Sequence, residues 1–199
     1  MPSTPEHTPK RPTLFAREPK NSGSIIFLGD SITAMGDWSK ILNDSTVINR
    51  GVDGNITSRV IRRLKNVTDH NPAKVFCLLG INDIRKNIPD VIIAENYLKI
   101  IGEIHNQCPK TKIYVQGVLP INPDLAYFSM HRDKQEHIVG LNTLLASHAK
   151  ERNYIYIDIF HLFADDKGRL SSQYTYDGLH LRPSAYPIWA EYLKKLGYL

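Results

Sequence analysis

The sequence has 199 residues, a mass of 22.7 kDa and a net charge of +5, with 42% hydrophobic and 23% charged residues. This length and balance exclude wholesale disorder and fibrous structure, and they are sufficient for one domain with its own hydrophobic core. No apolar run approaches the roughly 20 residues of a membrane span, so we expect no stable membrane insertion.

Residues 1–22 hold five of the twelve prolines and show almost no periodicity, so we interpret them as an extended tail before a domain at 23–199. Short apolar runs predict strands at 24–28, 46–50, 74–79, 112–116 and 154–158. Apolar residues at helical spacing predict helices between them, over 38–42, 56–67, 94–104, 138–149 and 186–196.

Five apolar strands that alternate with amphipathic helices predict an α/β domain with a parallel sheet. The strands are apolar almost throughout, as expected when helices cover both faces of the sheet. Right-handed crossovers leave few topologies, and we favour a flavodoxin-like three-layer α/β/α fold with a five-stranded parallel sheet in the order 2-1-3-4-5. Its ligand crevice lies at the carboxyl ends of strands 1 and 3.

Polar residues and glycines follow the first three predicted strands. Ser31 comes just after strand 1, where it could be either a helix cap or an exposed nucleophile. Gly51 closes strand 2, as a turn glycine or as a backbone N–H that can approach a ligand closely. Asn82 follows strand 3, as part of a polar turn or as an amide donor to a developing oxyanion. Because all three strand ends meet at one sheet edge, the functional interpretations support one another.

Near the carboxyl terminus, Asp177 and His180 lie three residues apart in a predicted loop. This spacing can place the carboxylate against one imidazole nitrogen and leave the other facing outward as a general base. For His7, His70, His105, His137 and His148 we favour ordinary solvated or capping roles.

These motifs, in this order, resemble the SGNH hydrolase superfamily of GDSL esterases and lipases: Gly29-Asp30-Ser31-Ile32, Gly51, Gly80-Ile81-Asn82-Asp83 and Asp177-Gly178-Leu179-His180. The resemblance covers residues 24–196 and is strongest to the compact bacterial acetylesterase and platelet-activating-factor acetylhydrolase-like branch. It implies the flavodoxin-like fold and ester hydrolysis without a metal or an organic cofactor.

Carried over residue by residue, the resemblance implies that Ser31 is the nucleophile, His180 the base and Asp177 the group that orients His180. The backbone N–H groups of Ser31 and Gly51 and the side chain of Asn82 would form the oxyanion hole. The resemblance leaves supporting roles for two further carboxyl groups, those of Asp30 and Asp83.

One departure concerns the substrate contacts. Many members of the superfamily carry a Gly-Asp pair soon after the second motif, whereas this sequence has Gly54-Asn55. The long segment 119–133, which includes Tyr127 and Phe128, could equally cover the site or form ordinary surface. Arg85 could contact the substrate, although a solvated side chain is at least as common for arginine.

The resemblance to the acetylesterase and acetylhydrolase-like branch implies a substrate with a short acyl group, above all acetyl, on a carbohydrate or another polar alcohol. Alternatives are a lysophospholipase or thioesterase of the same fold, a non-catalytic carbohydrate-binding relative, and a structural module, since fold alone does not define function. The intact serine, glycine, asparagine and histidine set argues against a pure binding protein.

Other partners follow from charge and cysteine content. The basic residues Arg59, Arg62, Arg63 and Lys65 lack interleaved aromatics, which favours a solvated helix face over a nucleic-acid site. Two cysteines do not form a disulfide scaffold. We therefore expect a small-molecule ester as partner and no nucleic acid, and we leave a homo-oligomer open. Without a visible signal peptide we expect a cytoplasmic protein, or an exported one if the native amino terminus was replaced.

Overall fold

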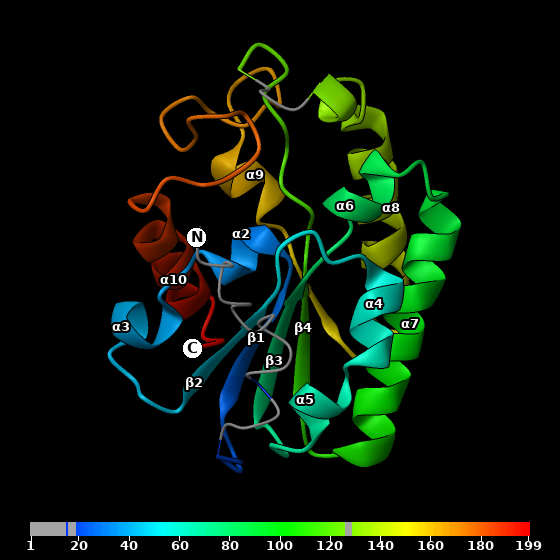
Figure 1. The fold of residues 1–199 in the computed structure, drawn as a ribbon, viewed down its shortest axis with the longest axis vertical. Coiled ribbons are helices and arrows are strands. Elements are labelled where there is room, and N and C mark those ends of the chain that lie inside the picture. The colour runs from blue at the N-terminus through cyan, green and yellow to red at the C-terminus, as the bar shows by residue number, and fades with distance from the viewer. Residues whose placement is uncertain (1–14, 16–18, 126–128) are drawn as a thin grey trace, which may run out of the picture.

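A central parallel sheet lies between two layers of helices in the computed structural model, which describes residues 15, 19–125 and 129–199 (Figure 1). The strand order is β2-β1-β3-β4-β5, and every neighbouring pair is parallel. The predicted fold class and strand order are therefore confirmed. The strands are β1 (Ile25–Gly29), β2 (Val47–Gly51), β3 (Lys74–Leu78), β4 (Lys112–Gln116) and β5 (Ile155–Ile157).

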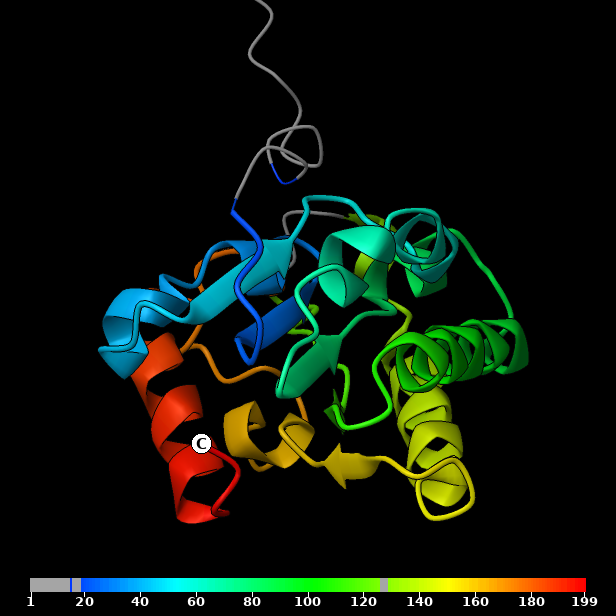
Figure 2. The same cartoon turned by 90° about the horizontal axis from the view of Figure 1, so that it is seen from below.

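Helices α3 and α10 cover one side of the sheet, and α4, α5, α7 and α8 cover the other, as the view along the strands shows (Figure 2). The helices are α2 (Ser31–Ala34), α3 (Trp38–Leu42), α4 (Thr57–Arg62), α5 (Lys65–Thr68), α6 (Ile81–Arg85), α7 (Asp90–Gln107), α8 (Gln135–His148), α9 (Phe160–Phe163) and α10 (Ala185–Lys195), with a short 3₁₀ turn η1 (Ser129–His131).

The chemistry of the strands explains why β1 and β3 are central. In β1, Ile26, Phe27 and Leu28 are fully buried, so both faces of the strand meet apolar side chains. Each of these strands ends in residues that open the next helix, and this places Ser31 and Asn82 at the same edge of the sheet.

The structure corrects the predicted helix over 56–67, which is divided into α4 and α5. At the division, the N–H groups of Arg63 and Leu64 donate to the carbonyls three residues earlier, at 3.0 and 3.3 Å. This tightened 3₁₀-type turn ends the regular helix, and the backbone of Arg63 leaves the helical conformation there.

Both cysteines lie inside the fold. Cys77 and Cys108 are free and buried, and burial raises the pKa of the Cys77 thiol to about 12.

None of the helices in the described ranges combines the length and apolar composition needed to cross a bilayer. The division into a tail at 1–22 and a domain at 23–199 stays a prediction, because most of the tail lies outside the described residues.

Candidate active site

Ser31 is the first residue of α2, and the residue before it caps that helix. Oδ1 of Asp30 accepts the N–H of Ile32 at 3.0 Å, which is the usual hydrogen bond of an N-cap side chain. The hydroxyl of Ser31 lies 3.0 Å from Nε2 of His180 instead. The structure thus decides between the two interpretations of Ser31: Asp30 is the cap, and Ser31 faces the histidine.

His180 is held by Asp177 from its own loop. Nδ1 of His180 lies 2.7 Å from Oδ2 of Asp177, and Oδ1 of Asp177 accepts the N–H groups of Leu179 and His180 at 2.9 and 2.8 Å. Partial burial tends to raise the pKa of Asp177, but hydrogen bonds from the His180 ring and from these two N–H groups outweigh it and lower that pKa. The carboxylate is therefore ionised at neutral pH and orients the ring.

The start of the segment 119–133 is hydrogen-bonded to the loop that carries Asp177 and His180. The N–H of Asn122 donates to the carbonyl of Gly178 at 2.8 Å, and its side-chain amide donates to the carbonyl of Leu170, also at 2.8 Å. Residues 119–122 are buried, so this part of the segment is structural support rather than surface. Whether the rest covers the site stays a prediction, since Tyr127 and Phe128 lie outside the described residues.

A second aspartate–histidine pair has the same spacing but different surroundings. Nδ1 of His161 lies 2.5 Å from Oδ2 of Asp158, and the His161 side chain is 78% exposed, against 19% for His180. No serine hydroxyl is bonded to His161 among the described residues. Spacing alone therefore does not distinguish the two pairs, and the contact with Ser31 does.

Asn82 stands beside the turn that carries Ser31, as predicted. Its side chain is buried, and Nδ2 donates to the backbone carbonyl of Asn55 at 3.2 Å. The same nitrogen lies 3.4 Å from Oδ2 of Asp30, a long contact that a stronger acceptor could replace. The amide can thus donate to an oxygen bound near Ser31.

Gly51 does not fit the predicted role as an oxyanion donor. Its N–H donates to Oδ1 of Asn49 at 2.8 Å, so this donor is already satisfied within the end of β2. A Cβ at position 51 would lie 2.3 Å from the backbone nitrogen of Ala34. Glycine is needed here because α2 passes directly over it.

Asn49 is a positioning residue that sequence reasoning did not select. Its Nδ2 lies 2.8–3.2 Å from the carbonyls of Thr33, Ala34 and Gly36, which end the Ser31 helix. A four-residue helix leaves such carbonyls without internal partners. One asparagine therefore fixes the carboxyl end of α2 against β2.

Gly54 offers the free backbone donor that Gly51 lacks. It has φ of +65°, and the space where a side chain would stand is open. Within the described part of the chain its N–H has no hydrogen-bond partner, and the next carbonyl, that of Asn55, binds Asn82. Gly54 adopts the left-handed conformation that glycine favours. The Gly54-Asn55 pair was therefore the feature of the sequence that could have indicated this donor.

The two supporting carboxyl groups lie under the site. Burial, together with the nearby charge of Asp83, raises the pKa of Asp30 to about 7. Burial also raises the pKa of Asp83, although the hydroxyl and N–H of Thr57 donate to its carboxylate at 2.6 and 3.0 Å and partly offset this effect. Asp83 therefore joins the start of α4 to α6.

Arg85, at the end of α6, is half-buried, and its contact with a substrate stays a prediction.

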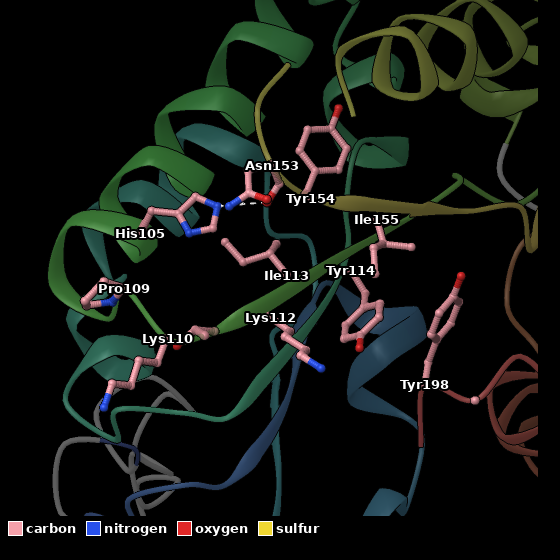
Figure 3. A pocket seen from close by; sticks show the side chains of 12 residues that line it. His105, Pro109, Lys110, Lys112, Ile113, Tyr114, Asn153, Tyr154, Ile155 and Tyr198 are labelled. Atoms are coloured by element: carbon pink, nitrogen blue, oxygen red, sulfur yellow. Dashed lines mark hydrogen bonds between the residues drawn. The ribbon is translucent and has the colours of Figure 1, made fainter. Parts of the chain in front are cut away.

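A separate cavity of about 470 Å³ opens at the other end of the sheet, where β4 and β5 begin (Figure 3). Its lining includes His105, Lys112, Tyr114 and Tyr198. In this view the ring of His105 turns toward Asn153, whose carbonyl lies 3.0 Å from Nε2. The cavity shares no lining residue with the Ser31 site.

Comparison with known proteins defines the class of this site. The model of the GDSL-like lipase/acylhydrolase family matches residues 27–188. The chain belongs to this family and is an ester hydrolase.

The relatives that match carry names of the same kind. The chain is 27% identical over 187 residues to an arylesterase from Vibrio mimicus, covering 86% of each protein. It is 27% identical over 168 residues to the platelet-activating factor acetylhydrolase IB subunit alpha2 of Gallus gallus, covering 81% of this chain and 70% of the relative. A solved structure described as a putative platelet activating factor from Streptococcus pneumonia superimposes with a TM-score of 0.83 at 28% identity, over 93% of this chain and 90% of that one.

Proposed function

We propose that this ester hydrolase removes short acyl groups, above all acetyl, from a carbohydrate or another polar alcohol through an acyl-enzyme on Ser31. The observation that carries the mechanism is the hydrogen-bonded chain from the Ser31 hydroxyl through both nitrogens of His180 to Asp177. Serine becomes a useful nucleophile only when an oriented base takes its proton. The acetyl preference is supported by the similarity to a relative named as an acetylhydrolase.

In the first half of the proposed reaction, Nε2 of His180 takes the proton of the Ser31 hydroxyl as its oxygen attacks the ester carbonyl. The Asp177 carboxylate accepts the Nδ1–H and stabilises the positive ring. The negative oxygen that forms would accept the N–H groups of Ser31 and Gly54 and the amide of Asn82, each donor contributing roughly 10²–10³ in rate. His180 then protonates the leaving alcohol.

In the second half, water attacks the acyl group on Ser31 while His180 takes its proton. The collapse of the second tetrahedral intermediate releases the acid, and the Ser31 oxygen recovers its proton from His180. No proton passes to Asp177, whose lowered pKa keeps it anionic. The hydrogen bonds from Ser31 to His180 and from His180 to Asp177 support this route for the proton.

A thioesterase or lysophospholipase is the second candidate, because two large side chains that are close in sequence to the site residues are exposed. Met35 is 56% exposed one helical turn after Ser31, and Tyr176 is 72% exposed beside Asp177. Such side chains could hold a longer acyl chain. This candidate differs from the first in one measurable property, the preferred chain length.

The test compares hydrolysis of p-nitrophenyl acetate and p-nitrophenyl octanoate by the wild type and by Ser31→Ala. We expect turnover that is lost in Ser31→Ala and a kcat/KM at least about tenfold higher for acetate, since several extra methylenes must be rejected. Preference for octanoate would favour the second candidate. Full activity of a folded Ser31→Ala protein would contradict the acyl-enzyme mechanism.

A further inference from the structure

Arg63 differs from the other cations of the basic run in which it occurs. Arg59, Arg62 and Lys65 are exposed, as expected for a solvated helix face, whereas Arg63 is half-buried. It is the C-cap residue that directly follows α4, and its backbone no longer has the helical conformation. Its side chain reaches under the edge of the sheet that carries Ser31.

The guanidinium of Arg63 donates to three acceptors from three different segments. Nε donates to Oδ1 of Asn55 at 2.9 Å. Nη2 donates to the carbonyl of Gly29 at 3.2 Å and to the carbonyl of Arg50 at 3.0 Å. The first acceptor lies in the loop after β2, and the other two lie at the ends of β1 and β2.

Two of these acceptors, those of Gly29 and Asn55, are one or two residues from a group of the proposed site. Gly29 precedes the Asp30–Ser31 turn. Asn55 follows Gly54, and its own carbonyl accepts the amide of Asn82. The third acceptor, the carbonyl of Arg50, belongs to the same peptide group as the N–H of Gly51. At this point of β2, α2 packs so closely that a Cβ on Gly51 would not fit. One side chain therefore links the nucleophile turn, the Gly54 donor and the Asn82 donor.

Arginine is suited to this task by its shape and charge. The carbonyl of Gly29 already accepts the N–H of Val52 at 3.1 Å, and the guanidinium of Arg63 uses the second lone pair of this oxygen. Hydrogen bonds from a cation are about twice as strong as neutral ones. The planar guanidinium holds several acceptors at fixed relative positions, which the single nitrogen of lysine does not.

We propose that Arg63 is a positioning residue of the hydrolase, which fixes the spacing between Ser31, the Gly54 N–H and the Asn82 amide. This inference rests on the proposed function, because those three groups would hold the oxyanion. Arg63 acts through the loops that it binds and does not touch the substrate. Its loss would misplace the donors, which matter most in the transition state.

The first test is Arg63→Lys, with Arg62→Lys as the matched control on the exposed face of the same helix. We expect kcat for p-nitrophenyl acetate to fall about 10- to 100-fold in Arg63→Lys, because a displaced oxyanion donor weakens transition-state binding. KM should change less than about threefold. Arg62→Lys should keep the wild-type kcat. A wild-type kcat in folded Arg63→Lys, or an equal loss in Arg62→Lys, would overturn the inference.

The second test is chemical rescue, which separates positioning from general stability. Ethylguanidinium at millimolar concentration should raise the kcat of Arg63→Ala at least tenfold, and ethylammonium should not, because only the planar fork matches the three acceptors. If Arg63→Ala does not fold, Arg63→Gln replaces it in the same assay. Equal effects of both cations, or no rescue of the folded variant by either, would overturn the inference.

Ser31→Ala, measured beside these variants, separates this inference from the proposed function. If Ser31→Ala keeps its activity, the acyl-enzyme mechanism fails and Arg63 loses its proposed task with it. If Ser31→Ala is inactive and Arg63→Lys equals the wild type, only the role of Arg63 fails. Loss of activity in both, with rescue by ethylguanidinium, supports both.

Discussion

The two aspartate–histidine pairs show that sequence spacing alone does not identify a catalytic histidine. Asp158 and His161 have the same separation and the same Nδ1 contact as Asp177 and His180. The difference lies at the other ring nitrogen, which meets the Ser31 hydroxyl in one pair. A base contributes to catalysis only within hydrogen-bond reach of the proton that it removes.

We therefore expect His180→Ala to lower kcat for p-nitrophenyl acetate by about 10⁴-fold or more, as removal of a triad member does elsewhere. His161→Ala makes the same substitution in the exposed pair and should remain within about twofold of the wild type. Steady-state kinetics on both purified variants provides the measurement. Similar losses in the two variants would show that the serine contact does not define the base.

The buried carboxyl of Asp30 makes stability depend on pH in a definite direction. Its pKa is raised to about 7 when folded, against about 3.9 in an unfolded chain. The folded state thus holds this proton more tightly, so its contribution to stability is complete below pH ~4 and is lost as the pH rises through about 7.

Asp30→Asn removes this titration. Between pH 4 and pH 8, the free energy of unfolding of the wild type should fall relative to that of Asp30→Asn by a few kcal/mol, at about 1.4 kcal/mol per pKa unit. Urea unfolding of both proteins at several pH values measures this difference. A difference that stays constant across the range would contradict the raised pKa.

At the residue scale, the sequence predicted those side chains whose role follows from standing directly after a strand or in a short loop. Ser31 and Asn82 belong to this group. It did not predict Arg63, because helical spacing does not show where a side chain points once the helix has ended. It assigned Gly51 an oxyanion role because nothing in the sequence shows that Asn49 occupies its N–H.

At the scale of elements, the long helices were predictable, whereas among the helices of four to six residues only α3 was predicted as a separate helix. The 18-residue α7 and the 14-residue α8 repeat their apolar stripe several times. The four-residue α2 and α9 contain barely one turn, so they have no period to detect. Yet α2 carries Ser31, and its placement depends on the contacts that it makes with β2.

The lack of space for a side chain between β2 and α2 at Gly51 allows a test at this scale. Gly51→Ala would place a methyl group against the backbone of Ala34 and should lower the free energy of unfolding by about 1–3 kcal/mol. Gly102→Ala adds the same methyl inside α7 with nothing within 4 Å, and should raise it by about 0.5–1 kcal/mol. Urea denaturation measures both changes. Equal and small effects would show that α2 can move away from β2 at little cost.

At the scale of the whole molecule, a row of aromatic rings crosses one face of the sheet. Phe27, Phe76 and Tyr114 are register partners on β1, β3 and β4, and their centroids are 5.0 and 4.6 Å apart. Phe27 also stacks on Trp38 of α3 at 3.9 Å, and Trp38 meets Trp189 of α10 at 4.8 Å. Three strands and two helices from opposite ends of the chain therefore share one packed cluster.

Such a cluster predicts cooperative unfolding, because no element can leave it without exposing the others. Phe76 is fully buried at the centre of the row, and Phe76→Ala should lower the free energy of unfolding by about 3–5 kcal/mol. Ile188→Ala, on the exposed side of α10, should change it by no more than about 0.5 kcal/mol. Urea transitions followed by tryptophan fluorescence and by far-ultraviolet circular dichroism should coincide. Since both tryptophans lie in this cluster, a fluorescence change that precedes the loss of helix would instead show that α3 and α10 detach from the sheet first.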